Sequence, residues 1–247
     1  MVEMSIARCR PGAIRPLRAV FLQELNAQFR YETAHHRGGT TNYLVSADKR
    51  QIGYGSVKDG ARRGGAVFEF YLLPPFRERA ADALRGIVRL AHAGTLECQS
   101  NDRFFASLVH ELSAPLPSDT ILFEPDGPNA GLSSDGVFRR RRRADRVFPH
   151  TMEPVGDYVI DVGGDVVATG GFLLHYNPPF ADLFMEVRPD ARRRGYGSFL
   201  IQGLIAECYL AGRVPAARTG TDNIASQRAL ARGGLRECGR MLRAVLD

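Results

Sequence analysis

Long apolar segments are missing from this sequence of 247 residues. No stretch reaches the roughly 18 uninterrupted apolar residues that a membrane-spanning helix needs. Residues 1–6 do not combine a basic segment with an apolar core, which is the pattern of a secretion signal. We therefore expect a cytoplasmic protein that has no membrane partner.

Cysteine is scarce and widely spaced. The four cysteines are Cys9, Cys98, Cys208 and Cys238. None of them lies in a CxxC motif or at a metal-binding spacing from a histidine. Scattered cysteines of this kind are typical of a reducing compartment, so we expect free thiols, no disulfide framework and no metal site.

Lysine is almost absent as well. Lys49 and Lys58 are the only lysines among 33 lysine and arginine residues, and the formal net charge is +6. One interpretation is a compositional bias toward arginine. The other is an anionic partner, because guanidinium groups form paired hydrogen bonds with phosphates. Composition alone does not distinguish a small phosphate-bearing ligand from a nucleic acid.

Apolar periodicity predicts strands and helices throughout the chain. In the first half, strands are expected at residues 6–9, 43–45, 52–55, 67–73 and 95–99, a loop at 33–41, and helices at 11–29, 78–92 and 103–112. In the second half, strands are expected at 120–123, 158–162, 166–176, 183–188 and 214–219, and helices at 195–211 and 223–232. Gly163-Gly164 predicts a two-residue hairpin turn, and Gly170-Gly171 predicts a bulge.

The two halves repeat one order of elements. Residues 90–102 match residues 209–223, and helices of similar length precede and follow each match. The pattern predicts a duplicated strand–strand–strand–helix–strand–helix unit, although two unrelated α/β segments of similar length would also produce it. Because residues 116–135 are rich in Pro, Gly, Ser and Asp, the boundary is expected there, with domains at 1–117 and 118–247.

The stretch with the most chemical information runs from Met185 to Ser198. A predicted strand leads into a short turn, then Arg192-Arg193-Arg194, then Gly195 and Gly197 at the start of a helix. The first N–H groups of a helix have no internal partner, and the peptide dipoles make that end positive. Glycine removes the Cβ atom that would hold an anion away from these groups. The pattern therefore predicts a pyrophosphate site, while a tight turn without a ligand is the alternative.

This motif resembles the signature of the GNAT family of N-acetyltransferases, which is Arg/Gln-x-x-Gly-x-Gly/Ala after a strand and at the start of a helix. Residues 192–197 fit it, and Val187-Arg188-Pro189 resembles the strand end that precedes it. A second cluster of the family is an Asn, a small residue three positions later, and Gly-apolar at positions eleven and twelve. The matching residues are Asn223, Ser226, Gly234 and Leu235.

The resemblance covers residues 155–240 well and the first half only in outline. The equivalent turn of the first half, residues 74–79, has no Gly-x-Gly. The resemblance therefore implies an α/β fold made of two tandem GNAT-like units, each with a mostly antiparallel central sheet flanked by helices. The first unit is interpreted as a degenerate copy that does not bind the coenzyme.

The resemblance also implies a function, the transfer of an acetyl group from acetyl-CoA to an amine that attacks directly. Backbone groups near Glu186 and Val187 would contact the pantetheine arm, and Asn223 and Ser226 would line its exit. The residues expected to hold the pyrophosphate are Arg192, Arg193, Arg194, Gly195, Tyr196, Gly197 and Ser198. Glu186 and Asp182 are the candidate proton acceptors, with a solvated strand residue and a turn residue as the alternatives.

One position departs from the family pattern. Many members have a tyrosine seven residues after the Asn, which protonates the departing thiolate, and Leu230 occupies that position here. Tyr196 and Tyr209 are poor substitutes, and His175 and Tyr176 could reach the acceptor side or serve a structural role. The alternative function is a non-catalytic acyl-CoA-binding sensor or scaffold.

The run from Arg139 to Arg143 is the remaining basic feature. It is interpreted as a solvated strand or loop, with a coenzyme-phosphate or acidic-acceptor contact as the second reading. A nucleic-acid partner is disfavoured because no groove-reading motif accompanies the run. The acceptor amine and the oligomeric state, including a homodimer, stay open.

Overall fold

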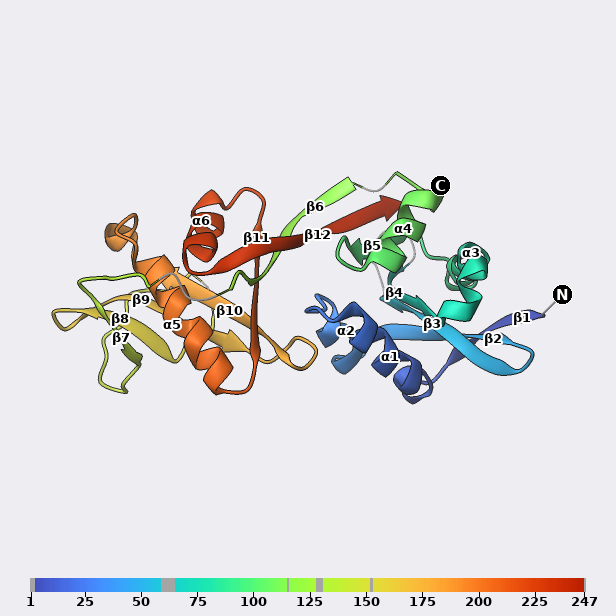
Figure 1. Ribbon diagram of the computed structural model, residues 1–247, viewed down its shortest axis with the longest axis horizontal. Helices are drawn as coiled ribbons and strands as arrows, with labels where there is room; N and C mark the ends of the chain where they lie inside the picture. Colours follow the sequence, from blue (N-terminus) through green and yellow to red (C-terminus); the bar gives the residue numbers. More distant parts are fainter. Residues whose placement is uncertain (1–2, 59–64, 115, 128–130, 152, 247) are drawn as a thin grey trace. The chain divides into compact units, whose positions relative to one another are not determined.

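The structure is a computed structural model that describes residues 3–58, 65–114, 116–127, 131–151 and 153–246. Packing divides the chain into two compact units (Figure 1). The N-terminal unit contains Met1–Ser118 and Arg240–Asp247, and the C-terminal unit contains Asp119–Gly239. The last eight residues therefore lie in the N-terminal unit, whereas the predicted domains placed them in the second.

The N-terminal unit has a sheet in the order β1-β2-β3-β4-β5-β12. All neighbours are antiparallel except β4 and β5, which are parallel. Its strands are β1 (Met4–Cys9), β2 (Thr40–Ala47), β3 (Arg50–Lys58), β4 (Ala66–Leu72), β5 (Thr95–Gln99) and the end of β12 (Leu235–Val245). Its helices are the short turns η1 (Pro11–Ile14) and η2 (Pro74–Arg79), with α1 (Arg15–Leu25), α2 (Glu32–His36), α3 (Ala80–Ala91) and α4 (Arg103–Leu112).

Two apolar clusters lie on opposite faces of this sheet. Helix α3 buries Ala80, Ala83, Leu84 and Ile87, which recur at helical spacing, in the larger cluster. The smaller cluster joins helix α1 to aromatic side chains of the sheet: Ile14, Leu17, Phe21, Phe29, Tyr54, Phe68 and Tyr71. Helices thus cover both faces of the N-terminal sheet.

The C-terminal unit repeats this order with different coverage. Its strands follow the order β6-β11-β10-β9-β8-β7, in which only β10 and β11 are parallel. They are β6 (Leu116–Pro125), β7 (Val137–Arg140), β8 (Tyr158–Val162), β9 (Asp165–Leu173), β10 (Phe180–Val187) and β11 (Val214–Gly220). Its helices are the short turn η3 (Pro189–Ala191), α5 (Tyr196–Leu210) and α6 (Ile224–Arg232).

One face of the C-terminal sheet carries the main core. Helix α5 buries Leu200, Ile201, Leu204 and Ile205 against Leu183 and its neighbours. On the other face, the described residues between β7 and β8 form no helix, and residues 141–151 and 153–157 are irregular. Phe148 of this segment packs on Val159 and Val166 of the sheet. The predicted duplication is confirmed, and the two copies differ at the position of α1 and α2.

The glycine pair of β9 is not a bulge. Gly170 and Gly171 keep continuous register with Met185 and Phe184, whereas the irregularity of β9 lies at Val167, where its pairing with β8 steps from Ile160–Ala168 to Asp161–Val166. A Cβ atom at Gly170 would lie 2.6 Å from the carbonyl oxygen of Phe184 and 3.1 Å from Leu204. The glycine is there because α5 packs closely on the strand, which periodicity does not reveal.

Each unit receives a strand that follows the other copy in sequence. Residues 217–220 of β11 pair with β6, which continues from the first repeat. Conversely, Met241–Val245 of β12, which follows the second repeat, pair with β5 in the N-terminal unit. The sequence patterns predicted only residues 120–123 of β6 and none of β12, because the partners of both strands are distant in sequence.

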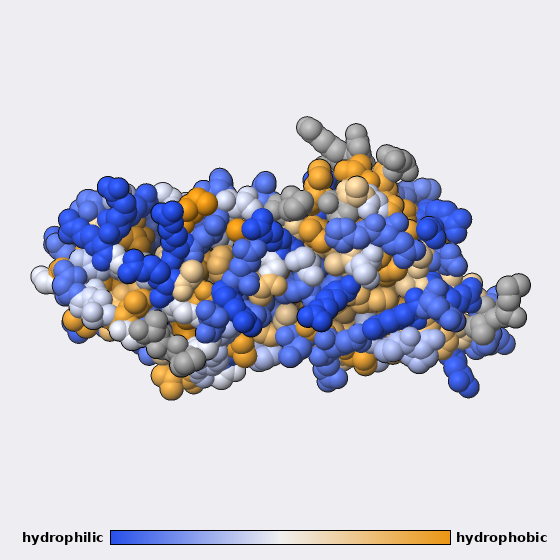
Figure 2. Space-filling view, turned by 45° about the horizontal axis from the view of Figure 1, so that its top comes forward, coloured by the Kyte–Doolittle hydropathy of each residue, from blue (hydrophilic) through white to orange (hydrophobic). Residues whose placement is uncertain are grey.

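Apolar residues are scattered among hydrophilic ones on the face shown in Figure 2. Among the described residues, no helix is both long enough and apolar enough to cross a membrane.

The exchanged strand predicts a stability effect. Leu242 is buried in the N-terminal core, and its replacement by alanine should lower the free energy of unfolding by about 2–4 kcal/mol. Val245 is a matched control, since it lies on the same strand with 47% of its surface exposed. Urea unfolding of both alanine variants measures the difference, and equal losses would contradict the assignment of this strand to the N-terminal core.

Candidate functional site

The parallel strands β10 and β11 separate after a short contact. Phe180–Asp182 pair with Val214–Ala216, and from residue 217 onward β11 pairs with β6 on its other side. Residues 183–187 of β10 continue alongside β9 alone. An open strand edge therefore leads from Asp182 to the end of β10, and its main-chain N–H and C=O groups face the gap.

Helix α5 begins beyond this open edge. Its first described main-chain hydrogen bond runs from the N–H of Phe199 to the oxygen of Gly195. Within the described chain, the N–H groups of residues 193–198 have no protein acceptor. These groups and the helix dipole make the start of α5 an anion site by its geometry.

Backbone conformation explains both glycines of the motif. Gly195 caps α5 with φ of 89°, in the left-handed region, and a Cβ atom there would meet no atom within 4 Å. Gly197 faces the strand, where a Cβ atom would lie 3.2 Å from the sulfur of Met185. Gly195 is therefore required by the turn, and Gly197 by the close packing of the helix on β10.

The three arginines of the motif are exposed. The Nε atom of Arg192 donates to the Val187 carbonyl at 3.2 Å, which ties the turn to the end of β10. Neither Arg193 nor Arg194 forms an ion pair with any residue that the structure describes. Two guanidinium groups thus remain available beside the N–H groups of α5.

Two other residues of the motif contribute only main chain. The ring of Tyr196 is 3% exposed and packs in the core, with its hydroxyl donating to Asp135 at 3.2 Å. Ser198 is 6% exposed. The N–H groups of both residues still point out of the first turn, so their predicted role is restricted to the backbone.

Asp182 lies where β10 and β11 part, in a cluster of charged and aromatic side chains. Its carboxylate is 2.8 Å from Nε2 of His175 and 3.4 Å from a terminal nitrogen of Arg218. Arg218 also donates to the hydroxyl of Tyr176 at 3.3 Å. The predicted proton acceptor Asp182 is therefore buried and already paired with an imidazole and a guanidinium.

Glu186 lies on the same face of β10 as Asp182, because the register between them is continuous. Its carboxylate accepts hydrogen bonds from the N–H and the hydroxyl of Thr151, at 3.1 and 2.9 Å. The residue opposite Glu186 is Thr169, whose hydroxyl lies 2.6 Å from Nε2 of His150. Four residues separate Asp182 and Glu186, which is about 13 Å along a strand, so they do not form one pair.

The second sequence cluster lies at the start of α6. The side chain of Asn223 accepts from the N–H of Ser226 at 3.1 Å, so it is the N-cap of this helix. Leu230 is 3% exposed in the core of the unit. A side chain at this position points into the protein, so Leu230, which departs from the family pattern, is a packing residue.

The arginine run is largely occupied by internal partners. Arg139 forms ion pairs with Asp145 at 2.8 Å and Asp161 at 2.6 Å, and the pKa of Asp145 is lowered to about 2 by Arg139. The Arg140 guanidinium lies 5.6 Å from the centre of the Tyr158 ring. The Nε atom of Arg141 donates to the Gly156 carbonyl at 2.8 Å. These contacts account for three of the five arginines as structural residues.

The N-terminal unit lacks the equivalent anion site. Turn η2 runs directly into α3, and the N–H of Ala80 donates to the Arg77 carbonyl within this continuous segment. One feature is kept in both units, since Nε of Arg77 donates to the Leu72 carbonyl at 3.2 Å, as Arg192 does to Val187. The copies thus share the turn but not its free N–H groups.

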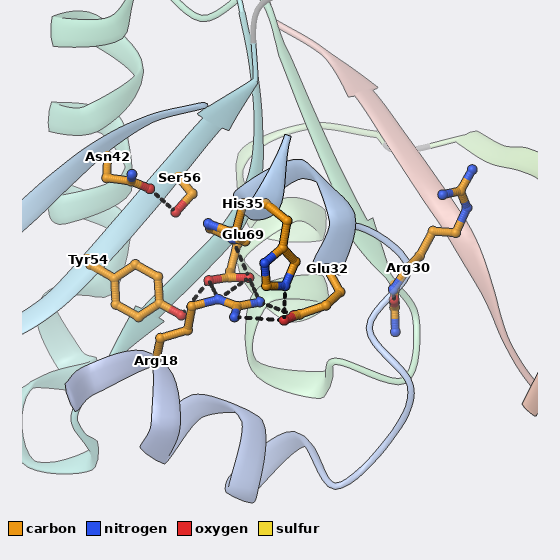
Figure 3. A network of polar contacts seen from close by, with 10 residues as sticks. Arg18, Arg30, Glu32, His35, Asn42, Tyr54, Ser56 and Glu69 are labelled. Carbon is orange, nitrogen blue, oxygen red and sulfur yellow. Dashed lines mark hydrogen bonds and ion pairs between the residues drawn. The ribbon is translucent and has the colours of Figure 1, made fainter. Parts of the chain in front are cut away.

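Side chains close the equivalent face of the N-terminal unit (Figure 3). Glu69 on β4 is fully buried and contacts Arg18 at 2.9 Å, His35 at 3.1 Å and the Tyr54 hydroxyl at 2.6 Å. Arg18 also pairs with Glu32. Burial raises the pKa of Glu69, but Arg18 and His35 outweigh it, so the pKa lies below its usual value. The network attaches α1 and α2 to the sheet.

In the N-terminal unit, the loop between α1 and α2 occupies the gap beside β5. The side-chain amide of Gln99 donates to the Gln28 carbonyl at 2.9 Å and accepts from the N–H of Arg30. The pairing of β4 with β5 stops after Ala66 and Val67, and the loop between α1 and α2 bonds to β5 beyond them. The open edge of the C-terminal unit has no such cover from its own described residues.

Sequence reasoning missed several residues around the open edge. Thr151 contacts Glu186, Thr169 lies opposite it and contacts His150, and Arg218 contacts Asp182. They come from an irregular segment and from neighbouring strands, so no spacing in the sequence connects them to the motif. The signal that existed was their residue type alone.

Comparison with known proteins agrees with this geometry. Residues 128–234 match a family model described as the acetyltransferase (GNAT) family. An acetyltransferase from Colwellia psychrerythraea has a TM-score of 0.77 at 14% identity, with 98% of this chain and 100% of that chain covered. A GNAT-type N-acetyltransferase from Sphaerobacter thermophilus has a TM-score of 0.60 at 16% identity, with 98% and 95% covered.

A tandem GNAT protein from the clavulanic acid biosynthesis pathway has a TM-score of 0.57 at 12% identity, with 98% of both chains covered. The predicted tandem fold is thus confirmed, since these matches span nearly the whole chain. No curated protein matches the sequence.

The cap of α5 predicts a measurable strain. Gly195→Ala should lower the free energy of unfolding by about 1–2 kcal/mol, since alanine disfavours the left-handed backbone while its Cβ meets no neighbour. Gly12→Ala is the matched control, because this glycine has equally open space without a positive φ. Chemical denaturation compares the two variants, and equal stabilities would show that the cap is not strained.

Proposed function

We propose that this chain, which belongs to the GNAT acetyltransferase superfamily, transfers an acetyl group from acetyl-CoA to an amine. The observation that carries the proposal is the unpaired N–H groups of residues 193–198, placed directly beyond the open edge of β10. A pyrophosphate and a peptide-like arm together require these two features. The C-terminal unit supplies both, and the N-terminal unit does not.

Residues 193–198 would hold the pyrophosphate through their N–H groups. Hydrogen bonds to a charged group contribute about 1.5–3 kcal/mol each, so three or four of them support micromolar affinity. Arg193 and Arg194 would add positive charge, and Arg192 would keep the turn against β10. The open edge at Glu186 and Val187 would bind the amides of the pantetheine arm, and Asn223 and Ser226 would lie at its exit.

The acceptor amine must lose a proton. An amine with a pKa near 10.4 is protonated at pH 7, and its deprotonation costs about 4.6 kcal/mol. Asp182 and Glu186 are the proposed proton acceptors, and both lie on the face of β10 away from α5. The pairing of Asp182 with His175 supports a relay in which the imidazole carries the proton onward.

In the overall step, the amine nitrogen bonds to the acetyl carbon, the carbon–sulfur bond breaks, and the sulfur leaves as a thiolate. Leu230 cannot donate a proton to it. This buried position also supports a second candidate function, a non-catalytic sensor that binds acyl-CoA. Release of free thiol from acetyl-CoA with a panel of amines separates the two, because a sensor binds the coenzyme without turnover.

Coenzyme binding is tested by a charge at the α5 cap. Gly195→Asp should abolish binding of acetyl-CoA, because its carboxylate would occupy the place proposed for the pyrophosphate. Gly195→Ala shares the backbone strain without the charge and should retain most of the affinity. Titration calorimetry gives both dissociation constants. An unchanged affinity in the aspartate variant would refute the proposed pyrophosphate site.

Proton transfer is tested by amide substitutions. Glu186→Gln and Asp182→Asn should each lower kcat, about 100-fold for the residue that accepts the proton. The loss should shrink as the pH approaches the pKa of the amine, because the free amine then needs no base. The measurement is the pH profile of kcat for each variant. A deficit that stays constant with pH would assign that residue a structural role.

A further inference from the structure

A cleft of about 300 Å³ lies in the C-terminal unit on the face of β10 that carries the candidate bases. Its floor is Phe184 and Gly171, which lie opposite each other on β10 and β9. Its wall is the irregular segment at residues 153–157. This segment lies between β7 and β8, where the N-terminal unit has its two helices instead.

The floor of the cleft lies between the two candidate proton acceptors. Phe184 lies on the same face as Asp182 and Glu186 and is two residues from each. Along the strand, each of these acidic residues is therefore about 7 Å from Phe184. A molecule resting on the Phe184 ring therefore reaches either carboxylate with a short extension. The volume is at the lower end of the range for small-ligand pockets, which favours a compact acceptor.

The charge of the cleft opposes that of the chain. Glu153 and Asp157 contribute carboxylates to its lining, and both residues are exposed. Neither forms an ion pair with a described residue, while the chain as a whole has a net charge of +6. The charge of Arg140 acts on Asp157, but its guanidinium lies 5.6 Å from the centre of the Tyr158 ring and forms no ion pair with that carboxylate. Two unpaired carboxylates in an arginine-rich protein favour a cationic ligand.

The one basic residue of the lining has a structural role. Arg141 donates from Nε to the Gly156 carbonyl at 2.8 Å, and its main-chain N–H donates to the Asp157 carbonyl at 2.8 Å. These two bonds fix the wall that carries Asp157. Gly156 packs so closely on Gly170 that a Cβ atom would lie 2.2 Å from the Gly170 oxygen. The wall is thus held in place by main-chain contacts with Arg141 and Gly170.

The floor suits a cation as well. An aromatic face attracts an ammonium group within about 6 Å of its centre. At Gly171, opposite Phe184, a Cβ atom would lie 3.1 Å from the tip of this ring, so the glycine leaves that part of the ring without a side chain against it. Carboxylates on the wall and an aromatic ring on the floor together form a site for an ammonium group with a short apolar stem.

We propose that this cleft binds the acceptor and that the acceptor is a small molecule with two amino groups. One ammonium group binds Glu153 and Asp157 over Phe184, and the other nitrogen, once neutral, lies at Asp182 or Glu186. That nitrogen bonds to the acetyl carbon as the carbon–sulfur bond breaks, its proton passes to the carboxylate, and the thiolate leaves. This inference rests on the proposed function for its chemistry, but the binding of a dication does not.

Binding is tested directly without the coenzyme. Calorimetry of the full chain with 1,4-diaminobutane should show at least about tenfold tighter binding than with 1-aminobutane, since only the diamine keeps an ammonium group on the wall when the other group is at β10. The double variant Glu153→Gln/Asp157→Asn should lose that preference. Asp165→Asn, in the exposed hairpin between β8 and β9, is the matched control and should keep it.

Turnover separates this inference from the proposed function. With saturating acetyl-CoA, the double variant should raise KM for 1,4-diaminobutane about tenfold or more and leave kcat unchanged, because neither carboxylate touches the reacting atoms. Equal affinity for the monoamine and the diamine, or a diamine affinity that survives in the double variant, overturns the inference. Absence of acetyl-CoA binding in the wild type overturns the proposed function instead. The diamine measurement then still decides whether the cleft binds a dication.

Discussion

The C-terminal unit depends on a pair of parallel strands that part after three residues. Because β11 turns to β6 for its partner, β10 keeps an open edge from Asp182 onward. Unpaired backbone in a protein is stable only where a ligand or water satisfies it. Helix α5 starts beyond this edge with a left-handed glycine and unpaired N–H groups. The candidate bases and the free arginines lie along that opening, whereas the cleft lies over β9 and β10 on the face that carries the bases.

The two copies of the fold show what the opening requires. In the N-terminal unit, η2 runs directly into α3, the loop between α1 and α2 bonds to Gln99, and a charged network around Glu69 attaches the helices to the sheet. In the C-terminal unit a shorter segment covers only part of the same face, and Phe184 and Glu186 stay accessible from it. The duplication thus leaves one copy filled by its own side chains and the other open.

Sequence patterns predicted the parts of the molecule that rest on local rules. Helices α3, α4, α5 and α6 show helical spacing, and the Gly-x-Gly turn carries its chemistry in adjacent residues. The patterns did not predict β12, the bulge position in β8 and β9, or the contacts of His150, Thr151 and Arg218. Each of these depends on a partner far away in the chain, and periodicity contains no information on such partners.

Hydrogen–deuterium exchange with and without acetyl-CoA decides whether the open edge of β10 and the start of α5 bind the coenzyme. We expect the coenzyme to slow exchange at residues 183–187 and 193–198, where the amides face the gap or lack a partner. We expect no change at residues 66–83 of the N-terminal unit, where η2 runs directly into α3 and side chains fill the same place. Protection in the N-terminal segment, or none at the start of α5, would show that the coenzyme does not bind at these amides.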